Sequence, residues 1–299
     1  MSSAQVAAKA IRDLEPEDWA VLHAIERSIS GHESVALNAI EGETKLHHDQ
    51  VEFRLGRLNY IGFVMRTRFG FILNTAGLDA IALNSLVKRN LISSMGKSIG
   101  MGKESDVFEV LSDSGKELVI KFYRIGRLSF RSTRRTRSYT SSETQHQWLS
   151  INIAAAQKEA VGLKKAQKAG IEVPELVARD RHAVLMSEIH GTMLFKCKAE
   201  DIKKPKPLLK KILDDIRKAY GADMINGDIS EFNILYDGEL PWIIDWPQFV
   251  PVSHANAEEM LQRDVQNATS FFERKFGLKY VLEEALDYVK GHKARVKIS

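Results

Sequence analysis

The sequence has a single cysteine, Cys197, in 299 residues, which excludes an intrachain disulfide and a four-cysteine zinc site. No apolar run approaches the roughly 18 residues that indicate a membrane-spanning helix. The N-terminus also lacks the basic and then apolar pattern of a signal peptide. Charge of one sign is not in large excess, because the formal net charge is only +4. These absences favour a reducing compartment without a membrane partner, and we expect the protein in the cytoplasm.

Length and composition indicate two globular domains. Hydrophobic residues make up 44% of the chain and charged residues 27%, which is the balance of an ordinary folded protein with a sizeable core. Across the polar, glycine-bearing stretch 89–100, the residue pattern changes from helical to strand-like. We therefore predict an N-terminal domain at 1–93 and a second domain at 94–299.

The first domain is predicted to be a winged helix-turn-helix. Apolar residues recur at three- and four-residue steps from Pro16 to Ile29, a second short helix is expected near 34–40, and a third begins around His47. A strand at 69–73, one of an expected pair, precedes a further helix that opens at 74–77. The alternative is an all-helical bundle that only positions the second domain.

Arginines around the third helix favour contact with nucleic-acid phosphates. Arg54 and Arg57 lie on that helix, and Arg66 and Arg68 lie on the expected wing. An ordinary solvated helix face is the alternative interpretation. The sequence leaves open whether the winged helix binds RNA, DNA or protein.

The second domain is predicted to be a two-lobed α+β domain, with an N-lobe at about 94–187 and a C-lobe at about 188–299. Its first two strands flank the turn "SDSGKE". The expected elements are strands at 106–111, 117–123 and within "HAVLMSEI", and helices at 153–169, 208–220, 256–276 and 279–290.

A glycine-rich loop is indicated by "IGMGKESDVFEV". Gly100, Gly102 and Val107 form a G-x-G-x-x-S-x-V array, in which Ser105 replaces the third glycine of the protein-kinase loop. A backbone without side chains can approach phosphate oxygens closely. An ordinary hairpin glycine pair is the alternative.

Lys121 lies within "LVIKFYR", among strand-forming apolar residues, as the nucleotide-binding lysine of kinases does. In kinases this lysine bridges the nucleotide phosphates and a helix glutamate, and Glu159 on the next predicted helix could supply that carboxylate. A strand lysine whose ammonium group reaches water is the alternative.

Three further residues follow the order of a phosphoryl-transfer site. Asp228 and Asn233 stand in the D-x-x-x-x-N relation of the kinase catalytic loop, and Asp245 takes the place of the metal-binding aspartate of D-F-G. Their oxygens suit magnesium, and Asp228 would orient or deprotonate the attacking hydroxyl or water. Helix caps and turns are the alternative use of each residue alone.

The stretches "GMGKESDVFEV", "VIKFYRIGRLSFR", "NGDISEFNIL" and "IIDWPQ" resemble the RIO family of atypical serine/threonine protein kinases. The winged-helix domain makes the chain similar to the second, archaeal-like branch, over essentially its whole length. The resemblance implies a two-lobed RIO kinase domain behind the winged helix. It also implies an ATP-binding set made of Gly100, Met101, Gly102, Lys103, Glu104, Ser105, Val107, Lys121, Glu159, Met186, Glu188 and Ile189.

The same resemblance implies that Asp228 is catalytic, that Asn233 and Asp245 bind the metal, and that Lys121 and Asp245 take part in catalysis. The cofactors would be ATP and Mg²⁺, with Mn²⁺ as a substitute. The implied activity is chiefly an ATPase switch on pre-ribosomal small subunits, with phosphorylated Asp245 as an intermediate, and secondarily a serine kinase. Two positions depart from the family: Asn226 replaces a histidine, and Trp246 replaces a phenylalanine, which the larger ring is expected to match in packing.

A basic segment follows Lys121, because no acidic residue occurs between Lys121 and Ser142. We expect a mobile loop that becomes ordered on ribosomal RNA, or whose serines are autophosphorylated within 127–147; a solvated linker is the alternative. Its arginines are Arg124, Arg127, Arg131, Arg134, Arg135 and Arg137.

The sequence is also compatible with two other functions. One is a small-molecule phosphotransferase, since "NGD…N…IIDW" is also similar to aminoglycoside and choline kinases, although the residues after Asp245 leave little room for their helical insert. The other is a nucleic-acid-binding protein that senses nucleotide without catalysis.

Overall fold

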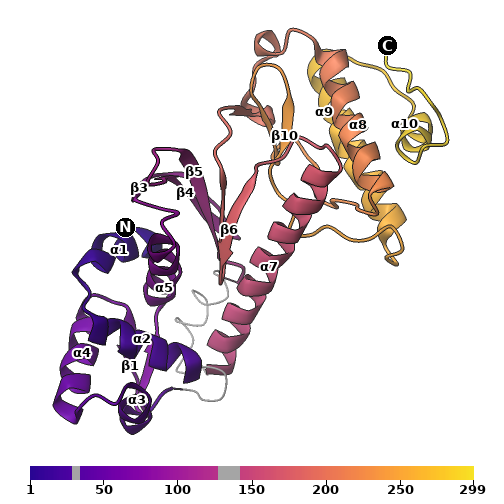
Figure 1. The fold of residues 1–299 in the computed structure, drawn as a ribbon. Helices are drawn as coiled ribbons and strands as arrows, with labels where there is room; N and C mark the ends of the chain where they lie inside the picture. Colours follow the sequence, from indigo (N-terminus) through magenta and orange to yellow (C-terminus); the bar gives the residue numbers. More distant parts are fainter. Residues whose placement is uncertain (29–33, 127–141) are drawn as a thin grey trace. The chain divides into compact units, whose positions relative to one another are not determined.

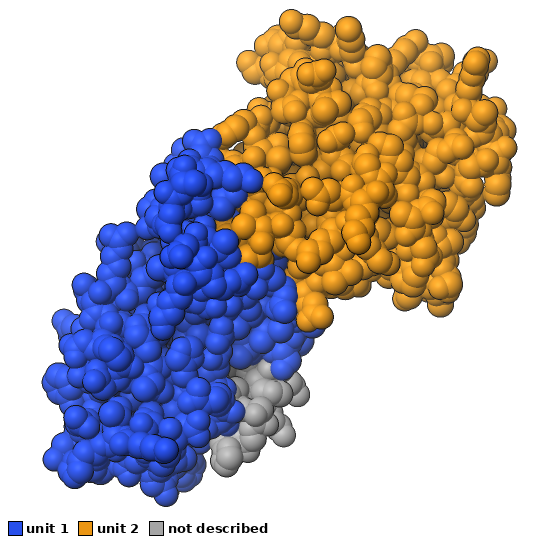
Figure 2. Space-filling model, in the orientation of Figure 1, with its two compact units in different colours: residues 1–154, 179–184 blue, residues 155–178, 185–299 orange. Residues whose placement is uncertain are grey.

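The computed structural model describes residues 1–28, 34–126 and 142–299, with the backbone alone for 142–147. The chain forms two compact units, residues 1–154 with 179–184 and residues 155–178 with 185–299 (Figure 2). Three elements run through both units, namely helix α7 (Ser142–Lys168) and strands β6 (Leu176–Asp180) and β7 (Ala183–Ser187) (Figure 1). The predicted domain boundary at 93/94 stays a prediction.

The first unit begins with the winged helix-turn-helix that the sequence predicts. Ser2 caps the first helix through a reciprocal pair of hydrogen bonds with Gln5. An antiparallel hairpin pairs Val64 with Leu73 and forms the wing. The elements are α1 (Ser3–Ala10), the 3₁₀ turn η1 (Ile11–Asp13), α2 (Pro16–Ser28), α3 (Leu37–Thr44), α4 (His48–Tyr60), β1 (Val64–Arg66), β2 (Phe71–Leu73) and α5 (Thr75–Lys88).

Helix α1 is absent from the sequence prediction, and α3 begins and ends later than expected. Only Ala4 and Ala7 are buried on α1, so this helix has no strong apolar face from which it could be predicted. Helix α5 is the most buried helix of the domain, and Leu78, Ile81 and Leu83 of α5 are each at most 2% exposed. It packs against α1 and carries one fully buried carboxylate, Asp79.

A five-stranded sheet follows, with the strand order β3-β4-β5-β7-β6. Strands β4 (Ser105–Leu111) and β5 (Glu117–Tyr123) are the two strands predicted around "SDSGKE". Strand β3 (Ser94–Met101) lies almost entirely in the stretch 89–100, for which no strand was predicted. The strand is an edge strand in which Met95, Ile99 and Met101 are mixed with serines, glycines and a lysine. The burial of its residues does not alternate regularly, as it does in a half-buried strand.

The second unit holds the C-terminal part of α7 and an all-antiparallel sheet with the order β10-β9-β8. The predicted helices are present, and α9 ends at Gly277, whose φ of 67° fits a left-handed cap. The three short strands were not predicted, because two or three residues carry no visible period. The elements are β8 (Thr192–Met193), the 3₁₀ turns η3 (Leu194–Lys196) and η4 (Ala199–Asp201), α8 (Pro205–Gly221), β9 (Ile234–Tyr236), β10 (Pro241–Ile243), α9 (Ala257–Phe276) and α10 (Leu282–Val289).

Candidate active site

The predicted site residues fall into two groups, one in each unit. The glycine-rich loop and Lys121 lie in the first unit, and the catalytic loop, Asp245, Glu159 and the predicted hinge lie in the second. The structure brings residues together within each group. The pairing of Lys121 with Glu159 joins the two units and stays a prediction.

The glycine-rich loop is the turn between β3 and β4. It is closed by a hydrogen bond from the Gly102 amide to the Ser105 carbonyl oxygen, at 2.8 Å. A side chain at Gly100 would meet only Val107, at an ordinary 3.7 Å, and one at Gly102 would come no closer than 3.5 Å to its neighbours. Neither glycine has a positive φ. The turn itself therefore does not require glycine, which favours a ligand that approaches the backbone closely.

Lys121 lies directly across the sheet from this loop. In the strand register Gly100 pairs with Val107, and Val107 pairs with Lys121. Lys121 is 7% exposed, and its Nζ lies 5.0 Å from the centre of the Tyr123 ring. This burial argues against an ammonium group that simply reaches water. The fold therefore places Lys121 across β4 from the glycine-rich loop, an arrangement that a nucleotide site would use.

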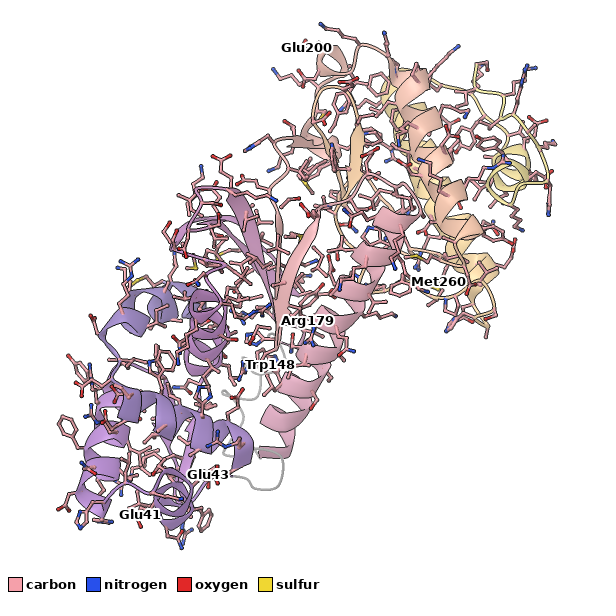
Figure 3. All side chains as sticks on the ribbon, viewed as in Figure 1. Glu41, Glu43, Trp148, Arg179, Glu200 and Met260 are labelled. Atoms are coloured by element: carbon pink, nitrogen blue, oxygen red, sulfur yellow. The ribbon has the colours of Figure 1, made fainter. Side chains whose placement is uncertain are left out.

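The catalytic loop of the second unit is shaped by Gly227. Its φ is 79°, a left-handed conformation that L side chains rarely adopt. A Cβ at this position would also collide with the Cε methyl of Met260, which is labelled in Figure 3. The next residue, Asp228, is exposed, whereas Gly227 and Ile229 on either side are buried. The turn thus presents one carboxylate from an otherwise buried segment.

Asp228 and Asn233, which stand in the D-x-x-x-x-N relation, contact each other. The Asn233 Nδ2 donates to the Asp228 Oδ2 at 2.7 Å and to the Asp228 carbonyl oxygen at 2.9 Å. Since the amide nitrogen is used in this way, the Asn233 Oδ1 is oriented away from Asp228 as an acceptor. This hydrogen bonding fixes both side chains relative to one another.

Asn226 connects this pair to Asp245. Its Nδ2 donates to the Asp245 carbonyl oxygen at 2.7 Å, and its Oδ1 accepts from the Asp228 amide at 3.0 Å. The Ile244 amide also donates to the Asn233 carbonyl oxygen at 3.1 Å. The position where the resemblance marked a missing histidine is therefore a two-sided bridge, and Asp228, Asn233 and Asp245 meet at one end of the β9–β10 hairpin.

Asp264 anchors the catalytic loop from α9, and sequence reasoning missed it. Its two carboxylate oxygens accept from the Gly227 amide at 2.7 Å and from the Ile229 amide at 2.9 Å. Burial raises the pKa of Asp264 to about 7, against the opposing effect of these two hydrogen bonds. The available signal was a carboxylate on an apolar helix face, since Leu261 and Val265 are buried on the same side.

Trp246 and Glu159 pack against each other in the second unit. Trp246 is fully buried, as expected for a larger ring in the phenylalanine position, and its Nε1 donates to the Ile243 carbonyl oxygen at 3.2 Å. The Trp246 amide donates to the Glu159 Oε2 at 3.4 Å. Gly162 permits this approach, because a Cβ there would lie 2.8 Å from the Trp246 Cβ.

The predicted hinge continues from the end of β7. Met186 is buried within the strand, and Ser187 is held to Glu175 by two hydrogen bonds of 2.9 Å. Glu188 and Ile189 follow directly as irregular chain. A contact of this segment with adenine stays a prediction.

The second unit offers donors that suit magnesium. In the described ranges no three His, Cys, Asp or Glu side chains form a group that could hold a metal by themselves. Asn233 and Asp245 supply hard oxygen atoms at one end of a hairpin, and Mg²⁺ is commonly bound by one or two carboxylates together with phosphate oxygens and waters. The residues therefore fit a metal that arrives with a nucleotide.

Arg54 and Arg57 hold the winged-helix domain together rather than standing free. Arg54 lies 2.7 Å from Glu15, and Arg57 lies 2.8 Å from the fully buried Asp18. The side chain of Arg54 is only 14% exposed. Their proposed contact with phosphates would require these ion pairs to break. Arg66 and Arg68 on the wing are exposed and lie over the rings of Phe71 and Phe69. The predicted arginines that follow Arg124 lie outside the described residues, namely Arg127, Arg131, Arg134, Arg135 and Arg137.

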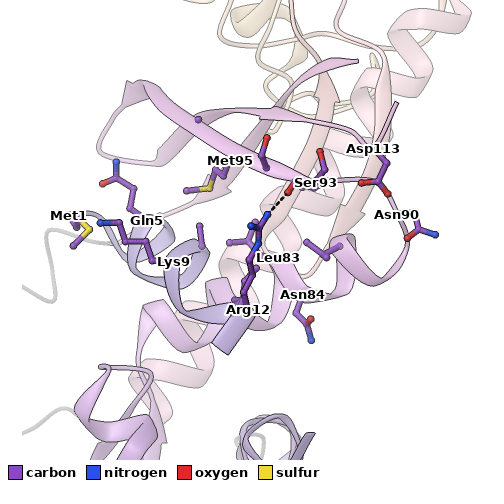
Figure 4. A pocket seen from close by; sticks show the side chains of 16 residues that line it. Met1, Gln5, Lys9, Arg12, Leu83, Asn84, Asn90, Ser93, Met95 and Asp113 are labelled. Atoms are coloured by element: carbon purple, nitrogen blue, oxygen red, sulfur yellow. Dashed lines mark hydrogen bonds between the residues drawn. The ribbon is translucent and has the colours of Figure 1, made fainter. Parts of the chain in front are cut away.

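Two further features of the described residues do not involve the predicted site. A cavity of about 920 Å³ in the first unit is lined by α1, α5 and the start of β3, and Arg12 beside it donates to the Ser93 carbonyl oxygen at 3.0 Å (Figure 4). No predicted nucleotide-binding residue lines it. None of the described helices has both the length and the apolar character that a membrane crossing requires.

Comparison with known proteins gives the class to which this fold and site correspond. The model of the RIO domain matches residues 106–285, and the model described as Rio2, N-terminal, matches residues 11–89. Because the first match spans more than half of the chain, the chain belongs to the RIO family of serine/threonine-protein kinases, and within it to the Rio2 type.

Individual relatives are similar to this chain over most of its length. The RIO-type serine/threonine-protein kinase Rio2 of Methanocaldococcus jannaschii is 37% identical over 81% of this chain and 91% of its own length. The serine/threonine-protein kinase rio2 of Schizosaccharomyces pombe is 35% identical over 91% of this chain and 80% of its own. The crystal structure of the Rio2 kinase-ADP/Mg²⁺-phosphoaspartate complex from Chaetomium thermophilum matches with a TM-score of 0.81 and 32% identity, covering 95% of this chain and 89% of that one.

Proposed function

We propose that the protein is an ATP-dependent serine/threonine kinase and ATPase that uses Mg²⁺. The observation that carries this proposal is the hydrogen-bonded set in which Asn226 joins Asp228, Asn233 and Asp245. A set of structural caps would not need to leave one carboxylate exposed between buried neighbours. A phosphoryl-transfer site needs an accessible carboxylate next to metal-binding oxygens.

Each residue has a distinct role in this proposal. Asp228 orients the attacking hydroxyl or water and accepts its proton. Asn233 and Asp245 bind Mg²⁺, which offsets negative charge on the phosphates. The backbone of the glycine-rich loop and the ammonium group of Lys121 bind the phosphate oxygens, and Glu159 orients Lys121. In these roles the groups position the nucleotide, the metal and the attacking oxygen and stabilise charge at fixed positions.

We further propose that Asp245 accepts the phosphoryl group when ATP is hydrolysed. A carboxylate oxygen of Asp245 forms a bond to the γ-phosphorus while the bond to the leaving ADP oxygen breaks. Water then attacks the phosphorus, and the carboxylate and inorganic phosphate are released. The Chaetomium thermophilum Rio2 kinase forms a complex described as phosphoaspartate, which supports this route. In the kinase reaction, a serine hydroxyl takes the place of water.

The proposed partner is the pre-ribosomal small subunit with its ribosomal RNA, in the cytoplasm. Support comes from the resemblance to the RIO family and from the run of arginines after Lys121 without an acidic residue. Arg124, which was predicted as one of six RNA-binding arginines, is 1% exposed and paired with Asp79, so it is not available to RNA. If the other five arginines each met one RNA phosphate, log affinity would fall with log salt by about 0.7 to 0.9 per contact. Serines within 127–147 are the proposed sites of autophosphorylation.

A single-turnover ATP assay tests the catalytic proposal. The rate is measured for the parent, Asp228→Ala and Asp245→Ala, with and without small ribosomal subunits. We expect each variant to lose about 10²- to 10³-fold in rate, as when one charge-stabilising group is removed from other enzymes. Equal rates in all three proteins would contradict catalysis at this site and favour a nucleotide sensor. Turnover that requires an amino sugar or choline would instead indicate a small-molecule phosphotransferase.

A further inference from the structure

Arg124 joins the winged-helix domain to the sheet of the kinase domain. It follows β5, is 1% exposed, and its Nη1 and Nη2 donate to the two carboxylate oxygens of Asp79 on α5, at 2.9 Å and 2.7 Å. Its Nε donates to the Asp106 Oδ2 at 3.1 Å, and its Nη2 also reaches the Ser3 Oγ at 3.2 Å. One guanidinium group therefore contacts α1, α5 and β4 together.

Arg124 also supports the glycine-rich loop through its backbone. The Arg124 amide donates to the Glu104 carbonyl oxygen at 2.6 Å, and Glu104 lies in the turn of the loop. Asp106 directly follows Ser105, the last residue of the loop. The backbone of Arg124 thus holds one residue of the loop, and its side chain holds the first residue after it.

His182 fixes Asp79 from the other side. His182 is fully buried, and its Nε2 lies 2.8 Å from the Asp79 Oδ1. Burial lowers the pKa of His182, so the neutral ring donates through Nε2 to the carboxylate. Although burial opposes ionisation of Asp79, Arg124 and His182 outweigh it, and the pKa of Asp79 lies below its ordinary value. Both oxygens of the ionised carboxylate are consequently used.

This cluster is an inefficient way to stabilise a fold. Its two buried carboxylates and single guanidinium group must all leave water, and the cost of that step often exceeds the attraction between the charges. A bidentate pairing of arginine with a carboxylate does provide a fixed direction for a planar group. The arrangement therefore fixes the position of the glycine-rich loop more than it stabilises the fold.

We propose that Asp79 is a positioning residue for the glycine-rich loop, through which the winged-helix domain sets the affinity for the phosphates of ATP. Asp79 fixes the plane of Arg124, and Arg124 holds Glu104 and Asp106 on the two sides of Ser105. The inference rests on the proposed function, because it assigns ATP phosphates to this loop.

Binding of a fluorescent ATP analogue tests the inference apart from catalysis. For Asp79→Asn, whose neutral amide cannot accept both guanidinium bonds, we expect a Kd about tenfold higher, as for a lost charged hydrogen bond. The single-turnover rate at saturating ATP should stay that of the parent. A second variant, Arg124→Lys, keeps the charge and the amide donor but loses the planar fork, and it should weaken binding similarly.

The matched control is Glu26→Gln. Glu26 on α2 accepts hydrogen bonds from the Nε and Nη2 of Arg181, so it also joins the winged helix to the sheet, but it does not contact the loop. Glu26→Gln should lower Tm, as Asp79→Asn does, with no change in Kd. If Asp79→Asn lowers Tm and leaves Kd unchanged, or if Glu26→Gln raises Kd equally, the inference is overturned while the proposed function stands. A parent protein that binds no ATP would overturn both.

Discussion

Replacing Asn226 by alanine removes both sides of the bridge in the second unit. The change leaves the Asp228 amide and the Asp245 carbonyl oxygen without their hydrogen bonds of 3.0 Å and 2.7 Å. Each buried group left unsatisfied costs about 1–3 kcal/mol. Asn226 is 2% exposed, whereas Asp245 is only half-buried and Asp228 is exposed. We therefore expect the lower part of the sum, a loss of about 2–4 kcal/mol in the free energy of unfolding.

The effect of Asn226→Ala on turnover should exceed its effect on ATP binding. Asp228 and Asp245 lose their common support, and small displacements of reacting groups cost about 10²-fold in rate. Asn226→His, which restores the residue usual in the family, can donate from one ring nitrogen to the Asp245 carbonyl oxygen and should recover most of the rate. The assay is single-turnover ATP hydrolysis, with urea unfolding measured on the same samples.

Asn256→Ala is the control for this experiment. Asn256 precedes α9, is exposed, and makes no side-chain hydrogen bond to the helix. It should leave both rate and stability unchanged. If Asn226→Ala keeps the parental rate at full occupancy with ATP, the bridge does not position the catalytic groups, and the reasoning is refuted.

The remaining predictions concern Asp264, Gly162 and the proposed metal. Because the folded-state pKa of Asp264 is raised to about 7, the rate should rise with pH through that value as the ionised carboxylate accepts both loop amides, and Asp264→Asn should remove this step from the pH profile. The folded state binds the proton of the Asp264 carboxyl more tightly than the unfolded state does. The contribution of Asp264 to stability is therefore present below pH 3.8 and lost as the pH rises to about 7. Urea unfolding at several pH values that showed the reverse trend would contradict the argument that burial raises this pKa. Gly162→Ala should destabilise the protein by about 1–3 kcal/mol, because the new methyl group collides with Trp246. The control Gly56→Ala, in open space on α4, should stabilise it by up to about 1 kcal/mol. Equal shifts in Tm for the two variants would show that the close packing at Gly162 does not determine its effect on stability. Chelation of divalent metal with EDTA should abolish turnover and leave Tm unchanged, since the metal is proposed to arrive with ATP; a drop in Tm would indicate a structural metal.

The sequence predicted the elements that carry long apolar patterns and the residues that lie in spaced motifs. The helix from Pro16, the strands around "SDSGKE" and the helix pair near the C-terminus were found because many residues contribute to each period. Asp228 and Asn233 lie close together in the sequence, and they contact each other within one loop. In each case neighbours along the chain determine the structure.

Residues whose roles depend on distant partners were missed. Asp264 lies 37 positions after Gly227, whose amide it accepts. Asp79 meets Arg124 across 45 positions, and nothing local in α5 indicates which cation it will contact. Asn226 was interpreted only as the replacement of a histidine. Its two hydrogen bonds depend on the β9–β10 hairpin, which places Asp245 next to the loop. Buried polar groups on apolar helix faces were the one available signal.

The edge strand β3 has a consequence for the behaviour of the unit in concentrated solution. An exposed strand edge is a template on which a second chain can add, and long apolar edges lead to aggregation. Strand β3 instead carries Lys97, which is 77% exposed, and its register with β4 shifts on both sides of Ser98. The charge of Lys97 and the irregular register therefore oppose edge-to-edge self-association along a strand that also exposes Ile99 and Met101.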